Sequence, residues 1–439
     1  MSLYQLEREK NIEKLIETIQ SSDNKSIRKR AIEIVGNIFE SGDYTEEDLI
    51  IQSNNGSKTL EDELEDAEDE GENVIDILLD VIVEDDGKIV RATAVDTLDK
   101  HSQESLERVV ERLSGEDIQF AADWAAAKTF NKYLKSEKPE LRMASAAGLG
   151  RVGDNRFIDD LINRLTDEDP RVRKRAVIAC GRVGDPSAVE PLESLFHKEK
   201  SMKVKRTIPY ALGEIGNGGS MKVLIDISEN DSESVRREVA NALGEYGSIE
   251  AVDTLVKYLK DPYEPVRRTA IFSMVKILSN ANAEQSHKIR EKTADELEDA
   301  TSSEVIPPLT DILTEASQAP QRRNSAWLLG RIVGTQHRSE VRSALIEALD
   351  DDDNMTAQFA VTSLTKLNDP HLESDLLRII DDDEKSHDAR KKSLFALGKI
   401  GGERSKRQIG EFVDRTDDED LRQQAFQSLS KLGGVGSDI

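Results

Sequence analysis

The chain has 439 residues, with 87 Asp and Glu against 60 Lys and Arg, so its formal net charge is −27 at pH 7. No apolar run approaches the roughly 18 residues that a membrane span requires, and the polar start MSLYQLEREK argues against a secretory signal. The single cysteine, Cys180, excludes a disulfide framework and a thiolate metal cluster, so we expect a soluble, cytoplasmic protein.

The acidity also constrains the partner and the source. A protein that binds duplex DNA normally carries a basic footprint, because its affinity comes largely from neutralising phosphates. Nucleic acid is therefore disfavoured as a partner unless the basic residues gather on one surface. Strong acidity is common in proteins that stay soluble in concentrated salt, since net charge governs solubility and not fold. It predicts a halophilic source.

In chain order, the sequence divides into repeats and interruptions. We expect a first repeat or cap at 1–39, an acidic flexible insertion at 40–72 and irregular repeats at 73–138. Regular repeats are expected at 139–279, a polar and partly helical insertion at 280–304, further repeats at 305–433 and a disordered tail at 434–439. The 40–72 insertion contains EDELEDAEDE, in which eight of ten residues are acidic.

The repeat is clearest in four stretches that align directly: ELRMASAAGLGRVGD, RVRKRAVIACGRVGD, KVKRTIPYALGEIGN and SVRREVANALGEYGS. We number each copy from the apolar residue that precedes the basic one, as position zero. In the regular part, position zero recurs at steps of 31, 32, 31 and 31, at Leu141, Val172, Val204, Val235 and Val266. The frame continues less regularly upstream and downstream, which makes eleven copies in all, at Ile27, Val90, Gln321, Thr356, Ala389 and Leu421.

The residue types at fixed positions predict a helix in each copy. Position plus four is small or apolar throughout, plus eight is apolar in every copy, and plus eleven is apolar in ten of the eleven. Spacings of four, four and three define one face of an α-helix. Another amphipathic stretch, such as SAVEPLESLF, precedes each of these helices. The sequence therefore predicts an all-α fold, an α-solenoid of about eleven helical hairpins.

The V-R-x-x-A-x-x-A-L-G-x-I-G-D pattern, with an acidic turn before it, resembles the short HEAT-like repeat first associated with phycobilisome lyases. The resemblance covers residues 10–38 and 72–433, with gaps. It implies that the second helices of the hairpins line the concave side. It also implies that the Arg or Lys at plus one, present in ten copies, forms a structural ladder with the acidic turn of its own or the neighbouring repeat.

The sequence offers little for catalysis. HEAT-like arrays can hold a di-iron hydroxylase site on His-Glu dipeptides, but none of the six histidines here is followed by Glu. Cys180 stands at the buried plus-eight position, and the Gly-rich turn at 216–219 lacks the strand and the GKS/T of a phosphate loop. The acidic clusters at 350–353, 381–384 and 417–420 match no calcium loop, and we favour helix capping over an ion site. We expect no enzyme, cofactor or metal.

Two positions outside the core arc suggest a binding surface in the concave groove. Position plus six holds four of the nineteen aromatic residues, Tyr210, Phe272, Trp327 and Phe395. Position plus ten is basic in eight copies, at Arg151, Arg182, Lys276, Arg331, Lys366, Lys399, Lys100 and Lys431. Two other interpretations remain open: the bases compensate helix dipoles, or the aromatic rings pack against the adjacent second helix.

We therefore expect a non-enzymatic protein–protein interaction scaffold or adaptor. It would bind a protein or peptide with an acidic or acidic-hydrophobic segment along the groove. The resemblance implies three alternatives: a taxis-type signalling adaptor in an archaeon, a nucleic-acid-binding protein similar to HEAT-like DNA glycosylases, and a chromophore lyase. The last two are less favoured, because the sequence shows neither a basic excess nor a nucleophile, acid or tetrapyrrole pocket.

Overall fold

The computed structural model describes residues 2–42, 44, 49–51, 72–116, 118, 122–281, 283–298, 302–332 and 337–433. These residues are overwhelmingly helical, which confirms the predicted all-α solenoid. A two-residue antiparallel ladder is the exception, between β1 (Ile50–Ile51) and β2 (Glu72–Asn73). In the described parts of the chain, no helix is long and apolar enough to cross a membrane. The chain forms two compact units, 1–223 and 224–439.

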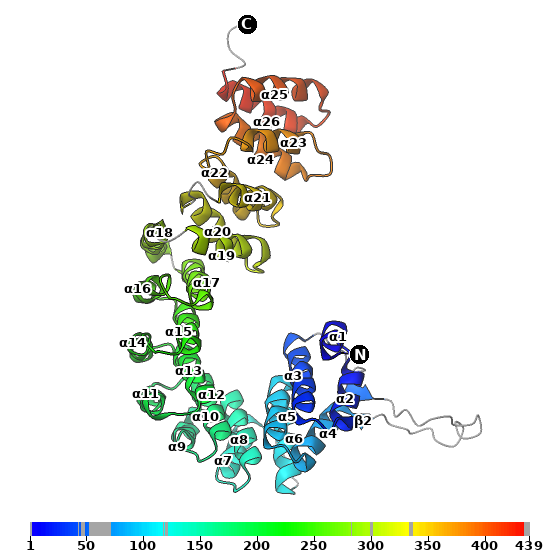
Figure 1. Cartoon of the computed structure of the whole chain (residues 1–439), viewed down its shortest axis with the longest axis vertical. Helices are drawn as coiled ribbons and strands as arrows, with labels where there is room; N and C mark the ends of the chain where they lie inside the picture. Colours follow the sequence, from blue (N-terminus) through cyan, green and yellow to red (C-terminus); the bar gives the residue numbers. More distant parts are fainter. Residues whose placement is uncertain are drawn as a thin grey trace, which may run out of the picture. The chain divides into compact units, whose positions relative to one another are not determined.

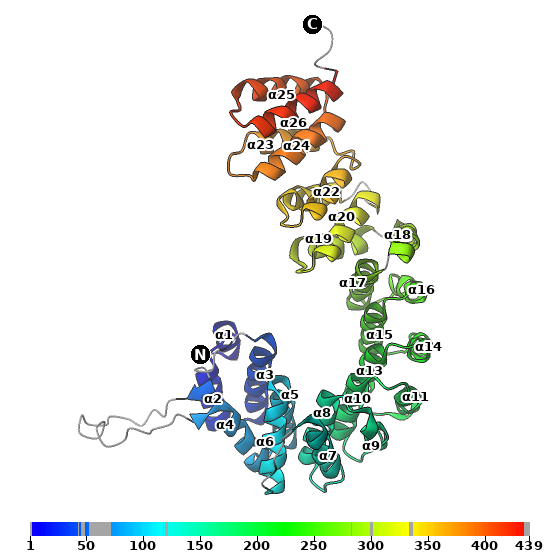
Figure 2. The same ribbon diagram turned by 180° about the vertical axis from the view of Figure 1, so that it is seen from behind.

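In the first unit the helices form two rows (Figures 1 and 2). The second helices of the hairpins form one row: α3 (Lys25–Ser41), α5 (Lys88–His101), α8 (Pro139–Val152), α10 (Pro170–Val183), α12 (Met202–Lys205) and α13 (Thr207–Ile215). The other row contains α2 (Ile12–Ser21), α4 (Val74–Glu84), α6 (Gln103–Ser114), α7 (Asp123–Tyr133), α9 (Ile158–Arg164) and α11 (Val189–Lys198). Helix α1 (Leu3–Glu9) precedes both rows, and α14 (Gly218–Asp226) spans the boundary between the units.

The second unit repeats the arrangement. Its second helices are α15 (Glu233–Tyr246), α17 (Glu264–Asn280), α20 (Ala319–Ile332), α22 (Asn354–Leu364), α24 (His387–Ile400) and α26 (Glu419–Lys431). The first helices are α16 (Ile249–Tyr258), α19 (Ser302–Glu315), α21 (Arg338–Glu347), α23 (Leu372–Ile380) and α25 (Glu403–Arg415). An additional helix, α18 (Ala283–Glu298), occupies most of the polar segment 280–304 and buries Ile289, Ala294 and Leu297.

The core follows the helical period of the repeat. The side chains at plus four and plus eight are buried in all eleven copies. Removing a Leu side chain such as that of Leu149 from water stabilises the fold by about 1.5–3 kcal/mol. Cys180 is one of these core residues, and burial raises the pKa of its thiol to about 12. The thiol therefore stays protonated at neutral pH and fills space as an apolar side chain does.

Small residues set how closely the second helices pack. Position plus nine is Gly in seven copies, and each of these glycines faces the plus-seven residue of the next repeat wherever that contact is described. A Cβ added at Gly150 would lie 2.8 Å from the Cα of Ala179, which no L side chain tolerates. A different glycine ends the helix: Gly184 caps α10 at φ 73°, in the left-handed region that disfavours other residues.

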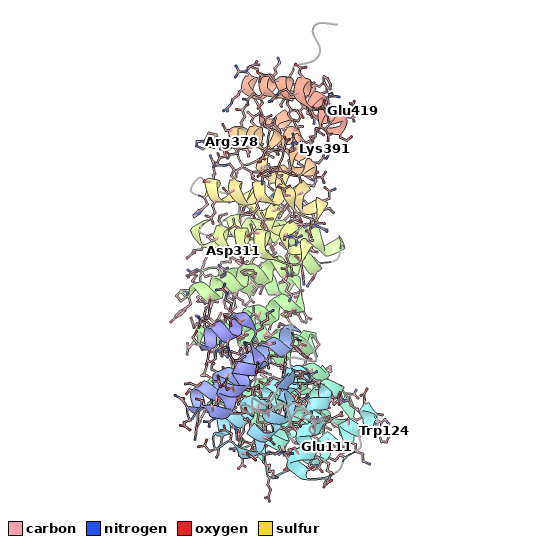
Figure 3. All side chains as sticks on the ribbon, turned by 90° about the vertical axis from the view of Figure 1, so that its right-hand side faces the viewer. Glu111, Trp124, Asp311, Arg378, Lys391 and Glu419 are labelled. Atoms are coloured by element: carbon pink, nitrogen blue, oxygen red, sulfur yellow. The ribbon has the colours of Figure 1, made fainter. Side chains whose placement is uncertain are left out.

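Two of the predicted interruptions lie largely or wholly outside the described residues. Of the acidic insertion 40–72, the structure describes only 40–42, 44, 49–51 and 72, and none of the tail 434–439. The segment 102–138, whose match to the repeat is poor, forms α6 and α7, both of which pack on α8. Trp124 projects from α7 with 63% of its surface exposed (Figure 3).

Candidate interaction surface

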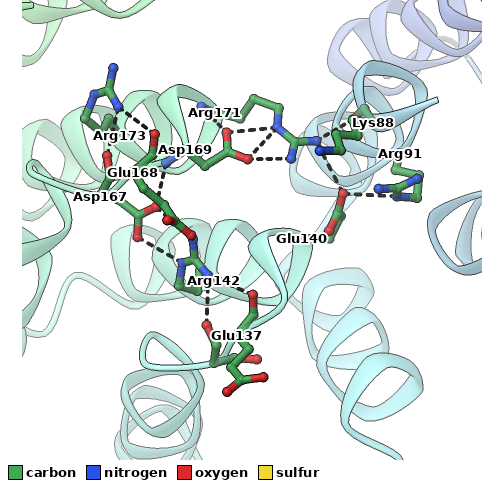
Figure 4. Close-up of polar contacts among 11 residues, drawn as sticks. Lys88, Arg91, Glu137, Glu140, Arg142, Asp167, Glu168, Asp169, Arg171 and Arg173 are labelled. Atoms are coloured by element: carbon green, nitrogen blue, oxygen red, sulfur yellow. Dashed lines mark hydrogen bonds and ion pairs between the residues drawn. The ribbon is translucent and has the colours of Figure 1, made fainter. Parts of the chain in front are cut away.

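The cations at plus one form a ladder along the first unit (Figure 4). Arg142 donates two hydrogen bonds to the carboxylate of Asp167, from Nε at 2.9 Å and Nη2 at 2.8 Å. The carbonyl of the same Asp167 accepts a 2.8 Å bond from Nη1 of Arg173, whose own Nε reaches Glu199 at 2.7 Å. Asp167 thus joins two successive arginines, so these cations are structural, as the resemblance implied.

The ladder recurs in the second unit. Arg236 binds the carboxylate of Asp261 at 2.6 and 3.0 Å, and the Asp261 carbonyl accepts from Arg267 at 2.7 Å. Burial alone would raise the pKa of Asp261, but the hydrogen bonds and charge of Arg236 lower it. Both partners are largely shielded from water, which makes removal of one of them costly.

The acidic clusters cap helices and join the ladder. In 350–353, Asp351 accepts from Arg322 at 2.7 and 2.8 Å, while Asp353 caps α22 through the backbone N–H of Thr356 at 2.7 Å. The hydrogen bond from Arg323 is the largest cause of the lowered pKa of Asp353. Asp418 caps α26 in the same way. Where the chain is described, no group of three or more His, Cys, Asp and Glu side chains is arranged to hold a metal.

In the second unit the plus-six and plus-ten residues come together. The Arg331 guanidinium lies over the Trp327 ring, with Cζ 6.0 Å from the ring centroid. Two ammonium groups, those of Lys399 and Lys431, each lie 4.6 Å from the centroid of the Phe395 ring. Because plus six and plus ten are one helical turn apart, ring and cation share one face. The result is a row of partly exposed rings with cations above them.

Phe272 completes this row with a different partner. It is 38% exposed, and its ring carries Arg268 at 5.5 Å in place of Lys276. Lys276 pairs with Glu245, and Arg331 also meets Glu291 and Asp295 at 3.1 Å. Three cations of the row make no ion pair with any described residue: Lys366, Lys399 and Lys431. Local acids thus neutralise only part of the row.

In the first unit the predicted groove cations have another target. Arg151 Nε lies 2.8 Å from Asp99 Oδ1, and Arg182 Nη1 lies 3.0 Å from the same oxygen. Arg175, which is buried, donates to Asp99 Oδ2 at 2.6 Å. Burial alone would raise the pKa of Asp99, but the charges of Arg175 and Arg182 and the hydrogen bonds lower it to about 2. Tyr210, on α13, remains 42% exposed.

Sequence reasoning did not single out Asp99 or Arg175. The available signal was a break in the pattern, because Asp99 stands at plus nine, where seven copies have Gly. A carboxylate at a position of close helix approach requires buried cations nearby. Its neighbour Asp96 belongs to the same cluster: it stands at plus six and pairs with Arg175 and, at 3.2 Å, with Lys174.

The match to a known family agrees with this architecture. The family described as HEAT repeats matches residues 127–208, 195–276 and 342–430. A HEAT repeat-containing taxis protein from Halobacterium salinarum is 37% identical over 465 aligned positions, covering 99% of both chains. An engineered protein is 15% identical with a TM-score of 0.37, covering 97% of this chain and 100% of that one. A chain from a study of the phosphorylation switch between cadherin and β-catenin is 13% identical with a TM-score of 0.41, covering 98% and 96%.

Proposed function

The chain belongs to the HEAT repeat family, and from that premise we propose that it is a non-enzymatic scaffold or adaptor that binds a partner protein or peptide along its second helices. One observation carries the proposal: the row of partly exposed rings and cations on α17, α20, α24 and α26. Aromatic and basic side chains of this kind are the usual anchors of protein interfaces. The proposed binding residues are those of the two predicted rows: Tyr210, Phe272, Trp327, Phe395, Arg151, Arg182, Lys276, Arg331, Lys366 and Lys399.

The row suits an acidic or acidic-hydrophobic segment of the partner. Lys366, Lys399 and Lys431 have charges that no described acid neutralises, so a carboxylate of the partner meets little local competition. The Phe395 ring offers apolar surface between two of them. Arg151 and Arg182 are less available for the same role, because Asp99 already binds both.

A narrower proposal concerns the biological setting. The similar chain from Halobacterium salinarum is named a taxis protein, and the similarity extends over 99% of both chains. This supports a taxis-type signalling adaptor in a halophilic archaeon, located in the cytoplasm. The net charge of −27 agrees with a saline cytoplasm. We also propose that the repeats belong to the phycobilisome-lyase type of HEAT-like repeat, on the strength of their ALGxIGD pattern.

Capture from a Halobacterium salinarum lysate in concentrated KCl tests the scaffold proposal. The immobilised chain, the double variant W327A/F395A and the control W124A are compared by quantitative mass spectrometry. Trp124 is 63% exposed on α7, so its replacement removes an equally large apolar side chain away from the row. We expect wild type and W124A to enrich the same proteins and W327A/F395A to lose them, because each anchor contributes about 2 kcal/mol or more.

The melting temperature separates binding from packing. Trp327 and Phe395 lie outside the hairpin core and are only partly buried, so the double variant should unfold near the wild-type temperature. If the melting temperature falls sharply while the same proteins are still captured, the rings serve packing between repeats, and the scaffold proposal loses its binding surface. Enrichment of taxis signalling proteins would support the narrower proposal, and their absence from a reproducible set of partners would contradict it.

A further inference from the structure

The first unit contains a pocket on the inner side of its second helices, with a volume of about 510 Å³. Its walls come from α3, α5, α10 and the start of α12, and Met143 of α8 contributes to it from between α5 and α10. It forms because α5 and α10 meet across α8: Arg171 Nη1 donates to the Lys88 carbonyl at 2.5 Å. Residues far apart in sequence therefore converge at one place.

Positive charge dominates the lining of this basic pocket. Only two acids line it, Glu33 and Asp96, against six cations: Lys29, Arg30, Lys100, Arg171, Lys174 and Lys203. The formal charge of these side chains is therefore +6 − 2 = +4, in a chain whose net charge is −27. Four acids beside the lining pair with three of these cations: Glu7 with Arg30, Glu40 with Lys100, and Glu140 and Asp169 with Arg171. An anionic ligand is therefore attracted where a cation is unpaired or where its acidic partner is exposed.

The cations differ in how firmly they are held. Arg171 is fixed by Asp169, Glu140 and the Lys88 carbonyl, and Lys174 is fixed by Asp96. Lys203 makes no ion pair with any residue that the structure describes. Lys100 pairs at 2.7 Å with Glu40, whose side chain is 68% exposed and easily released to water. The pocket thus combines cations held by local acids with Lys203, which is unpaired among the described residues, and Lys100, whose acidic partner is exposed.

The pocket also has an apolar side. Ile89, at the start of α5, is 56% exposed. Contact with water does not stabilise so large an aliphatic side chain. Ala92, Met143 and Pro170 continue the apolar surface beside it. Apolar surface flanked by cations matches a segment that carries an apolar side chain between carboxylates.

We propose that the basic pocket is a docking site for an acidic peptide segment of a partner protein, with an aliphatic side chain against Ile89 and carboxylates on Lys100 and Lys203. This inference rests on the proposed scaffold function and adds a site in the first unit, separate from the aromatic row. A long polyanion such as nucleic acid fits less well, because outside the pocket its phosphates would face the acidic surface of the chain.

Fluorescence anisotropy with the labelled peptide acetyl-DELLDEL-amide tests the proposal on the full chain. The variant K100E/K203E reverses two pocket charges, and the matched control K128E/K222E reverses two exposed lysines of the same unit on α7 and α14. We expect the first variant to weaken binding by about tenfold or more and the control by less than about twofold. I89S, which changes no charge, should weaken binding by about threefold or more. Circular dichroism at the working KCl concentration verifies that each variant is folded.

Four other ligands define the chemistry. The amide analogue NQLLNQL and the polar analogue DESSDES should both bind more weakly than DELLDEL. Equal binding of DELLDEL to K100E/K203E and wild type, or an equal loss in K128E/K222E, would overturn the site. Binding of a serine-phosphorylated peptide or a single-stranded oligonucleotide more than about tenfold tighter than DELLDEL would assign the pocket to phosphate instead. The proposal would also be overturned if DELLDEL did not bind wild type at 1 mM, because a dissociation constant of 1 mM corresponds to a binding free energy of only about 4 kcal/mol.

The variant W327A/F395A distinguishes this proposal from the one on which it rests. Its substitutions lie in the second unit, so K100E/K203E should cause the same loss of DELLDEL affinity in the W327A/F395A background as in wild type. If W327A/F395A captures the same partners from the lysate while K100E/K203E loses the peptide, the aromatic row fails and the pocket stands. The reverse result removes the pocket and leaves the scaffold function.

Discussion

Arg175 of α10 donates a 2.6 Å hydrogen bond to Asp99 of α5, although another second helix, α8, lies between these two in the row. Arg151 of α8 binds the same carboxylate at 2.8 Å. One buried anion therefore joins three successive second helices. Asp99 stands at plus nine, where most repeats have Gly. Ion pairs therefore join the second helices here, whereas other repeats join them by close packing at that glycine.

We expect Asp99→Asn to destabilise the first unit by about 3–5 kcal/mol, since three arginines lose their common counter-ion. Asp99 has a pKa of about 2 in the folded chain, below the value of about 3.9 in an unfolded one. A lowered pKa contributes stability above the unfolded value, here about 2–3 kcal/mol, and this is lost as the pH falls towards 2. Denaturation of wild type and Asp99→Asn between pH 6 and pH 2 should show that the difference between their free energies of unfolding shrinks as the pH falls. A constant difference would contradict the assignment.

The ladder predicts that Arg142 cannot be replaced by another cation. Arg142→Ala should cost about 3–5 kcal/mol, because it leaves the buried Asp167 without its bidentate partner. Arg142→Lys should recover little, since an ammonium cannot also reach the Ser136 and Glu137 carbonyls as the guanidinium does. Arg112→Ala is the control: the Arg112–Asp80 pair is largely exposed and should change stability by less than about 1 kcal/mol. Urea denaturation followed by circular dichroism measures all three.

The close approach of second helices predicts opposite effects for two glycines. Gly150→Ala places a methyl group 2.8 Å from the Cα of Ala179, so the helices must separate, at a cost of about 1–3 kcal/mol. Gly410→Ala, on α25, meets nothing within 4 Å and should stabilise by about 0.4–1 kcal/mol through the unfolded state. Thermal unfolding of the two variants should therefore shift in opposite directions. A stabilising Gly150→Ala would disprove the packing role of plus nine.

The acidic segment 52–71 should be dispensable for the fold. Its ends meet in the β1–β2 ladder, where Ile51 is opposite Glu72, so a two-residue Asn-Gly turn can close the hairpin. We expect this replacement to leave the melting temperature within about 5 °C of wild type, since the removed tract is polar and acidic, with Leu60, Leu64 and Ala67 as its apolar residues. A larger fall, measured by circular dichroism, would show that the segment packs against the first unit.

Local periodicity was enough to predict the fold, because a repeat of about 31 residues states its burial pattern many times. Leu149, Leu212 and Leu397 all stand at plus eight and all are buried. Spacing along a helix is a local property, so the partnership of Trp327 with Arg331, one turn apart, could be anticipated as a shared face. That Arg142 and its equivalents bind acidic turns was implied by the resemblance to the HEAT-like repeat.

Contacts between non-adjacent repeats could not be predicted in this way. Arg151 and Arg182 share a position with Lys399, yet Asp99 binds the two arginines while Lys399 lies over a ring. The basic pocket brings Lys29, Lys100 and Lys203 together from three different repeats and three different positions in the frame. The small rotation from each repeat to the next decides which of them meet. That rotation depends on side-chain packing summed over several helices, so it cannot be read from local spacing. The sequence determined the helices, their buried faces and their close contacts. Only the tertiary structure decided where distant charges converge.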